Sequence, residues 1–295
     1  MKPNIVILGS HGMLGWKVLN QFKNTKYNLK CQVRNKKSQK SLIKKLNLNK
    51  KVKFFYFDIE KDKIDTLFKK ISNKDVIINC IGKIKPFINE NDLNQIQTAI
   101  KVNSLFPIEL SKIIKTKKNK IYQIATDCVY SGENGNYNEM SKHDALDVYG
   151  KTKSLGEVNQ KNFFNIRVSI IGKELNTNNS LVEWFLSNEK KEKIFGFKDH
   201  LWNGVTTSVF AQILYTIIDK KIKIPNNFHL VPKDKVNKYE LMRYLKKHYD
   251  FKNLNIIKKN SNMTINRVLE TSHKLVNDKI WLKTKYKKKL NIKEI

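Results

Sequence analysis

A glycine-rich turn near the start of the chain constrains the fold more than any other feature. Gly9, Gly12 and Gly15 follow the apolar run at residues 5–8 and precede an amphipathic segment that ends at Phe22. With this spacing, the first glycine permits a tight turn, the second lets the backbone approach a pyrophosphate, and the third lets helix pack on strand. The turn and the free N–H groups of the following helix therefore predict a dinucleotide site.

Short apolar runs alternate with helical patterns over the first 170 residues. We expect strands at residues 4–8, 29–33, 52–57, 75–81, 121–125 and 163–168. We expect helices at residues 13–22 and 64–71, and a long one at 91–115 that is bent near Pro107. The repeated strand–helix order predicts an α/β fold of the Rossmann type, a doubly wound parallel sheet covered by helices on both faces.

The pattern loosens after residue 170. We expect helices at residues 180–187, 208–218 and 238–249 and a strand at 228–231. Residues 1–170 are predicted to form an NAD(P)-binding domain, and residues 171–295 a smaller C-terminal substrate-binding lobe that is partly interleaved with it. The tail from Lys283 is rich in lysine, and we expect it to be poorly ordered.

The chain is strongly basic, with 58 Lys and Arg against 26 Asp and Glu and a net charge of +32. A polyanionic partner would account for this charge, and so would an AT-rich genome, since lysine, asparagine and isoleucine are abundant throughout. A run at residues 30–53 holds many basic residues and no acidic one. Because no recognition motif accompanies the charge, we expect no nucleic-acid partner.

Other features bound the compartment and the chemistry. No apolar run is long enough to span a bilayer, and the first is too short for a signal-peptide core. Cys31, Cys80 and Cys128 do not suggest a disulfide framework in a chain of 295 residues, and the six histidines show no metal-ligand spacing. These observations predict a cytoplasmic protein without a metal site.

Tyr149 and Lys153 lie four residues apart and therefore on one face of a predicted helix. A phenol has a reference pKa of about 10, so it exchanges protons poorly near neutrality. An ammonium held nearby is expected to lower that pKa and make the phenol a usable acid. A tuned phenol and a dinucleotide site in one chain predict hydride transfer.

The end of the second predicted strand distinguishes the two nicotinamide cofactors. A carboxylate there would hold an unmodified ribose, whereas an arginine accommodates a 2′-phosphate. The chain has Arg34, which favours NADP(H) over NAD(H) as the alternative. Asp58 follows the third strand, either at the adenine edge or as a cap of the next helix. The predicted cofactor-binding residues are Gly9, His11, Gly12, Met13, Leu14, Gly15, Arg34, Asp58, Ile59, Cys80, Ile81, Gly82 and Lys153.

The motifs together resemble the extended short-chain dehydrogenase/reductase superfamily, and within it the dTDP-4-dehydrorhamnose reductase (RmlD-like) family. The matching stretches are Gly-Ser-His-Gly-Met-Leu-Gly at 9–15, Lys-Val-Asn at 101–103, Ala-Thr-Asp-Cys-Val-Tyr-Ser-Gly at 125–132, Val-Tyr-Gly-Lys-Thr-Lys-Ser-Leu-Gly-Glu at 148–157 and Asn-Ile-Arg-Val-Ser at 165–169. The resemblance is strong over residues 1–170 and weaker beyond. It implies an NADPH-dependent reductase of a nucleotide-activated 4-keto(-6-deoxy) sugar in the synthesis of surface polysaccharide precursors.

The resemblance also implies roles for individual residues. Tyr149 would donate a proton to the carbonyl oxygen, Lys153 would hold the nicotinamide ribose, and Thr126 would hydrogen-bond the carbonyl. Asn103 would support a water relay behind Lys153. The residues expected to contact the substrate, a nucleoside-diphosphate sugar, are Thr126, Asp127, Tyr149, Trp202, Asn203 and Thr206.

Alternatives remain open at this point. Sugar-nucleotide dehydratases of the superfamily carry Thr-Asp-Glu where this chain has Thr126, Asp127 and Cys128, so elimination lacks its base. A nucleotide-sugar 4-epimerase uses the same tyrosine and lysine with bound NAD. A non-catalytic dinucleotide-binding regulatory protein is a third interpretation, although such a protein has no use for a tuned phenol. The sequence leaves the oligomeric state open, a homodimer included.

Overall fold

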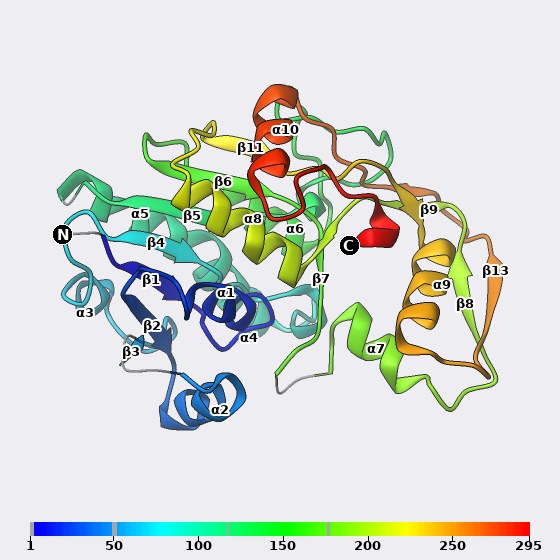
Figure 1. Cartoon of the computed structure of the whole chain (residues 1–295), viewed down its shortest axis with the longest axis horizontal. Coiled ribbons are helices and arrows are strands. Elements are labelled where there is room, and N and C mark those ends of the chain that lie inside the picture. The colour runs from blue at the N-terminus through cyan, green and yellow to red at the C-terminus, as the bar shows by residue number, and fades with distance from the viewer. Residues whose placement is uncertain (1–2, 49–51, 117, 176–177) are drawn as a thin grey trace.

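The computed structural model describes residues 3–48, 52–116, 118–175 and 178–295, so residues 49–51 of the basic run lie outside it. Its centre is a seven-stranded parallel sheet in the order β11-β6-β5-β4-β1-β2-β3 (Figure 1). The strands are β1 (Ile5–Leu8), β2 (Leu29–Val33), β3 (Val52–Tyr56), β4 (Val76–Asn79), β5 (Lys120–Ile124), β6 (Phe163–Arg167) and β11 (Asn227–His229). The chain winds outward in both directions from β1, which confirms the predicted doubly wound α/β class.

Helices cover both faces of this sheet. One face carries α1 (Gly15–Phe22), α2 (Lys36–Leu46), α8 (Thr207–Asp219) and α10 (Lys274–Lys283). The other carries α3 (Ile64–Phe68) and α5 (Phe106–Thr116), with α4 (Leu93–Ile100) and α6 (Val148–Leu155) beside them. Because both faces are covered, β1 and β4 are buried at every residue, which is why they read as continuous apolar runs.

The long helix predicted at residues 91–115 is interrupted where the bend was expected. A π-helical turn at Lys101–Leu105 separates α4 from α5, and the Phe106 N–H donates to the Lys101 carbonyl five residues back. Pro107 follows at once; it has no N–H, and its ring would clash with the carbonyl of Asn103 in a regular helix. The wider turn accommodates this proline, and Asn103 lies within the turn.

The later segments build a separate lobe from short strands. β7 (Ile170–Ile171) pairs with β10 (Val205–Thr206), and β8 (Lys193–Phe197) pairs with β13 (Asn255–Lys259). β9 (His200–Trp202) lies between β12 (Val236–Asn237) and β14 (Ile265–Asn266). With α7 (Leu181–Ser187) and α9 (Lys238–Tyr249), they enclose their own apolar core, at the right of Figure 1.

The chain crosses between the two parts more than once. After β10 it returns to the central sheet as α8, which packs on α1, and as β11, which pairs with β6. The central sheet and the helices on one of its faces therefore include segments from the later part of the chain. The division into a domain at residues 1–170 and a lobe at residues 171–295 stays a proposal, because α8 and β11 come after residue 170 but belong to the central sheet and its layers.

The prediction of a poorly ordered tail after Lys283 is wrong. Leu290 and Ile292 are buried, and the Ile292 N–H donates to Asp234 Oδ1 at 2.7 Å. The tail ends in a 3-10 turn at Ile292–Glu294 against the lobe core. Its apolar residues stand between lysines that point to solvent, so lysine content alone misled the prediction. In the described ranges, no helix is long and apolar enough to cross a bilayer.

Candidate active site

The glycine turn has the geometry that its spacing predicts. Gly9 adopts a left-handed conformation with φ of +74°, which favours glycine, and a Cβ on Gly15 would overlap the Gly9 carbonyl. The Gly12 N–H donates to Gly9 O at 3.0 Å. A Cβ on Gly12 would approach only that carbonyl, at 3.3 Å, and otherwise meet open space. The turn therefore leaves room for a pyrophosphate at Gly12 and at the start of α1, and it fits a dinucleotide.

Gln32 on β2 fixes the turn to the sheet, a role that sequence reasoning missed. Its Oε1 accepts from the Gly9 N–H at 2.7 Å, and its Nε2 donates to the Phe57 carbonyl at 2.5 Å. A buried glutamine in an apolar strand was the available signal, because buried amides are hydrogen-bonded. The side chain thereby connects the turn with the end of β3.

The end of β2 lies close to the turn. The Ser10 N–H of the turn donates to the Gln32 carbonyl at 3.2 Å, and Arg34 follows directly after β2. Burial and then the charge of Arg34 lower the pKa of His11. Arg34 itself is exposed, and Asn35 caps α2 by accepting from the Ser38 N–H at 2.9 Å. The first turn of α2 carries Lys36 and no acidic residue, so this positive helix end is electrostatically suited to an anion.

The predicted residues after β3 and β4 lie at the same edge of the sheet. Cys80 donates its N–H to the Leu8 carbonyl, and burial raises the pKa of its thiol to about 12, so it is an inert protonated group. Gly82 lies against Asn103 Oδ1. Met13 and Leu14 lie where α1 begins, and Leu14 is its N-cap residue.

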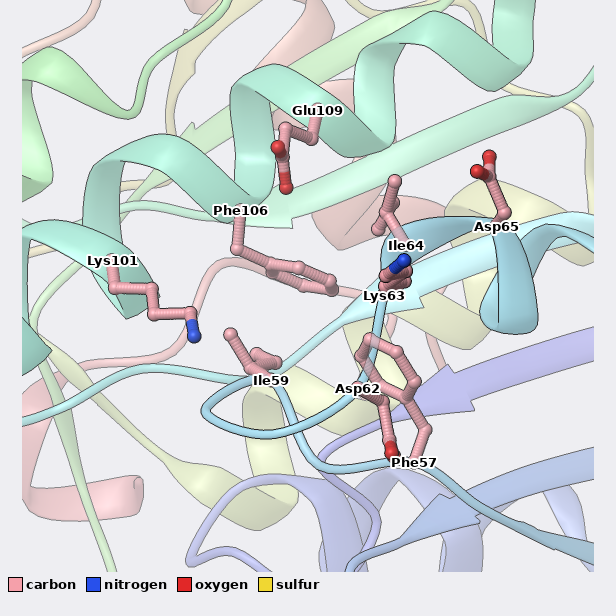
Figure 2. Close-up of a pocket in the computed structure, with 9 residues that line it drawn as sticks. All are labelled: Phe57, Ile59, Asp62, Lys63, Ile64, Asp65, Lys101, Phe106 and Glu109. Carbon is pink, nitrogen blue, oxygen red and sulfur yellow. The ribbon is translucent and has the colours of Figure 1, made fainter.

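Asp58 does not cap the following helix, for which Lys63 is the N-cap residue. Instead its carbonyl and side chain close a turn over residues 58–62. The side chain of Ile59 points into the core on the α3–α5 face and lines a separate hollow of about 340 Å³. Figure 2 shows this hollow between Phe106, Lys101 and Ile59. The hollow is distinct from the predicted catalytic residues, since neither Tyr149 nor Lys153 lines it.

Thr126 and Tyr149 meet at the carboxyl end of β5, where ligands bind in open α/β sheets. Thr126 follows β5, and its hydroxyl accepts from the Cys128 N–H at 3.1 Å. Tyr149 is the second residue of α6, whose N-cap Asp147 accepts from the Gly150 N–H. A Cβ on Gly150 would overlap the Cys128 carbonyl, so this glycine lets α6 approach the loop that carries Thr126.

The pKa of Tyr149 contradicts the prediction that Lys153 lowers it. Burial raises the pKa of this phenol above its ordinary value, and its hydrogen bond with Thr126 acts in the opposite direction. The carboxylates of Asp127 and Asp147 raise it further. The phenol is therefore protonated at neutral pH, the state that a proton donor requires.

Lys153 lies one turn further along α6 and is 7% exposed. Its Nζ donates to the Ile124 carbonyl at 2.8 Å, which holds the ammonium at the end of β5. Burial lowers the pKa of Lys153 to about 8, against the opposing effect of the Glu157 carboxylate. The ammonium and the phenol are thus placed together, with both still protonated at neutral pH.

Asn103 joins the end of β4 to α6. Its Oδ1 accepts from the Lys83 N–H at 2.9 Å, and its Nδ2 donates to the Lys83 carbonyl and to Thr152 Oγ1. A Cβ on Gly156 would overlap the Asn103 carbonyl, so the end of α6 packs directly on the π-helical turn. The structure gives the amide a bridging position, and its role in a water relay stays a prediction.

Two cations of the lobe, Lys238 and Arg267, approach the same loop, and sequence reasoning missed both. Burial lowers the pKa of Lys238, while the charge of Asp127 raises it and that of Arg267 lowers it. The Lys238 Nζ lies 5.9 Å from the centre of the Trp202 ring. Arg267 donates from Nε to the Tyr130 carbonyl at 2.8 Å. These two positive charges therefore flank the Thr126–Asp127 loop from the lobe side.

The three lobe residues predicted for the sugar pocket all have partners within the protein. Trp202 donates from Nε1 to Ser169 Oγ at 2.8 Å. Asn203 exchanges two hydrogen bonds with the backbone of Leu269. Thr206 is the N-cap of α8 and accepts from the Val209 N–H. These residues fix the wall of the lobe that adjoins the loop.

The chain matches the model of the family described as RmlD substrate binding domain over residues 1–272. It belongs to that family. The predicted family is thereby confirmed, and the match extends well beyond the first 170 residues, into the lobe. Among curated proteins, no match to the sequence is found.

Solved structures share the fold of this RmlD-type chain. A dTDP-4-dehydrorhamnose reductase from Clostridium acetobutylicum is 19% identical, with a TM-score of 0.71 over 99% of this chain and 96% of that one. The Bacillus anthracis reductase, in complex with NADP, is 15% identical with a TM-score of 0.68 over 94% and 93%. A UDP-glucuronic acid 4-epimerase from Bacillus cereus, in complex with UDP-glucuronic acid and NAD, is 18% identical with a TM-score of 0.73 over 99% and 96%.

Proposed function

We propose that this protein is an NADPH-dependent reductase of a nucleotide-activated 4-keto(-6-deoxy) sugar. The observation that carries the proposal is the convergence of Thr126, Tyr149 and Lys153 at the end of β5, beside a glycine turn that fits a dinucleotide. Membership of the RmlD family and the reductases of the same fold support it. Such a reaction serves the synthesis of surface polysaccharide precursors.

Each residue has a defined task in this proposal. Thr126 and Tyr149 orient the ketone oxygen, and Tyr149, whose pKa is raised by burial, donates its proton there. Lys153 stays charged below about pH 8 and holds the nicotinamide ribose. The bound cofactor supplies the hydride that reduces the sugar carbon. The charge on the ketone oxygen is thus neutralised by a proton from a group already within reach.

We propose NADP(H) as the preferred cofactor, with NAD(H) as the alternative. Arg34 follows the end of β2, which the Ser10 N–H of the glycine turn binds at the Gln32 carbonyl, and the first turn of α2 carries no acid that would repel a phosphate. The B. anthracis reductase is a complex with NADP, whereas the B. cereus epimerase is a complex with NAD. The relative affinities for the two cofactors are the direct measurement.

On the substrate side, we propose that Thr126, Asp127 and Tyr149 contact the sugar. Trp202, Asn203 and Thr206 shape the opposite wall. Lys238 and Arg267 are suited to the diphosphate, because they bring two positive charges to the loop at Asp127. The substrate class is therefore a nucleoside-diphosphate sugar.

The test follows NADPH oxidation by absorbance with a panel of nucleotide-linked 4-keto-6-deoxy sugars. Oxidation that depends on the added sugar is the expected result, and the best substrate identifies the sugar and the nucleotide. Tight NADPH binding without oxidation of any panel member would contradict the reductase proposal.

A nucleotide-sugar 4-epimerase is the second candidate, because the same fold carries that activity in the B. cereus enzyme. An epimerase should purify with tightly bound NAD, while the reductase should need added NADPH. Acid extraction of the purified protein and analysis of the released nucleotide separates the two.

We also propose a cytoplasmic location and a homodimer. All three cysteines are free thiols, which suits a reducing compartment. Fractionation of cells and sedimentation of the purified protein are the respective tests.

A further inference from the structure

The first acidic residue of the chain is Asp58, so the side chains of residues 1–57 carry no negative charge. An AT-rich genome accounts for abundant lysine, but it does not account for this gap, because the rest of the chain holds all 26 acids. The described part of this stretch forms β1, α1, β2, α2 and β3, at one side of the central sheet. The unbalanced charge is therefore concentrated in one part of the molecule.

The outward side of α2 consists of lysines and one isoleucine. The helix buries Leu42 and Leu46 in the core. At about 100° per residue, the opposite side of the helix carries five exposed residues, Lys36, Lys37, Lys40, Ile43 and Lys44, which we call the α2 face. Ile43 is 43% exposed among these lysines. Figure 1 shows α2 at the lower edge of the molecule.

The electrostatics within the helix oppose this arrangement. Lys36 and Lys37 place positive charge in the first turn, where the helix dipole is also positive. Lys40 lies four residues from both Lys36 and Lys44, and like charges at this spacing destabilise a helix. Among the described residues, no acid forms an ion pair with a lysine of α2. The α2 face is therefore complementary to an anionic partner from outside the chain.

Helix α1 holds α2 in place and adds to its charge. Lys23 of α1 donates from Nζ to the Leu46 carbonyl at 2.7 Å, which connects α1 to the last turn of α2. Lys45 is exposed beside the α2 face. Burial and then the charge of Lys45 lower the pKa of Lys17 on α1. The α2 face thus belongs to a larger positive surface that the fold presents.

We propose that the α2 face docks the protein reversibly on an anionic lipid bilayer. The lysines meet the lipid phosphates as point charges, and Ile43 enters the interface between them. Nucleic acid fits the face less well, because the face has no arginine for bidentate contacts with bases and no aromatic ring for stacking. Each lysine contributes about fivefold in affinity, so the association is weak and sensitive to salt. The inference is independent of the proposed reductase activity.

The experiment measures sedimentation of the full-length protein with vesicles of equal parts phosphatidylglycerol and phosphatidylcholine, and with vesicles of phosphatidylcholine alone. It needs neither cofactor nor sugar, so its outcome is separate from that of the activity assay. The test variant is Lys40→Gln/Lys44→Gln/Lys45→Gln, which removes three charges from the carboxyl half of α2.

The matched control is Lys61→Gln/Lys69→Gln/Lys70→Gln, which removes three exposed lysines around α3, on the opposite face of the sheet. Both triple variants have the same net charge, so they differ only in where the charge is lost. Ile43→Gln tests the apolar contact, which a bilayer senses and a nucleic-acid phosphate does not.

Wild-type protein should bind the anionic vesicles and not the neutral ones at about 0.15 M salt. It should be released at about 1 M salt, where the screening length falls to about 3 Å. The test variant should bind roughly a hundredfold more weakly, and Ile43→Gln about fivefold more weakly. The control variant should stay within about twofold of wild type, because its charges lie farther from the bilayer than the screening length.

No binding of wild type to anionic vesicles would overturn the inference. Equal losses in the test and control variants would also overturn it, because binding would then follow net charge alone. Tighter binding to random-sequence duplex DNA than to vesicles, without an effect of Ile43→Gln, would assign the face to nucleic acid instead. Circular dichroism checks folding, and if the triple test variant does not fold, Lys44→Gln alone must weaken vesicle binding about fivefold.

Discussion

The edge of the central sheet and the lobe above it use polar residues in opposite ways. At the edge, Thr126 follows β5, and Tyr149 and Lys153 lie on α6. All three side chains are at the carboxyl end of β5. In the lobe, the side chains of Asn203 and Thr206 are engaged by backbone from distant parts of the chain. The edge presents reactive groups, whereas the lobe uses its polar residues largely to hold itself together.

This difference has a physical origin. Parallel strands bring their carboxyl ends to one edge, so residues that follow them in the sequence meet in space. The lobe strands are two to five residues long and pair over long separations, as β8 does with β13. Such strands need side-chain contacts to fix their pairing. Because Thr126, Tyr149 and Lys153 lie at the edge while Lys238 and Arg267 approach it from the lobe, we expect the edge to determine the rate of the reaction and these lobe cations to determine which substrate binds.

The largest effect is expected from Tyr149→Phe at the sheet edge. Loss of the proton donor should reduce kcat by roughly a thousandfold, while NADPH binding changes little because the ring remains. Turnover is measured by NADPH oxidation and binding by fluorescence titration. A variant with turnover like that of wild type would show that the edge does not supply the proton.

The next largest effect is expected in the pH dependence of the reduction rate, which depends on Lys153 at the sheet edge. Lys153 has its pKa lowered by burial to about 8 and loses its positive charge above that value, while the raised pKa of Tyr149 keeps the phenol protonated. The rate of reduction should therefore be constant below about pH 8 and fall roughly tenfold per pH unit above it. A profile of kcat that rises through this range would contradict the assignment of Lys153.

Arg34→Ala tests the part of the edge that faces the cofactor. Removal of a cation that binds a 2′-phosphate should weaken NADPH by roughly tenfold or more and leave NADH nearly unchanged. Dissociation constants for both nucleotides provide the measurement. Equal losses for the two would show that Arg34 does not read the phosphate.

The smallest effect is expected from Lys238→Met, which tests whether the lobe governs substrate binding. If the lobe governs substrate binding, KM for the nucleotide sugar should rise about tenfold with kcat nearly unchanged. Lys235→Met, an exposed lysine just before β12, is the matched control and should leave both constants alone. A fall in kcat without a change in KM would place Lys238 with the chemistry and abolish the contrast between lobe and edge.

The strands of the central sheet were predicted well because each is a short apolar run that can be recognised without reference to the rest of the chain. Strand β2 begins and ends at the predicted residues 29–33, and the helix at 238–249 was also predicted residue for residue. The π-helical turn at Lys101–Leu105 was anticipated only as a bend near Pro107, since a proline in a helical pattern predicts an interruption but not the hydrogen-bond pattern that replaces the regular turn. The helix α10 was not predicted, because its apolar face, with the fully buried Trp281, is covered only when α10 packs against α8.

The sequence by itself determined the glycine turn, the doubly wound sheet and the pair of Tyr149 and Lys153, because all three depend on spacings within one or two elements. The tertiary structure decided the charge states of that pair. Burial raises the pKa of Tyr149 and lowers that of Lys153, and neither effect is readable from a four-residue spacing. It also brought Lys238 and Glu157 into the electrostatic environment of the site. Desolvation and Coulomb interactions act between groups that are close in space, and only the folded chain defines which groups those are.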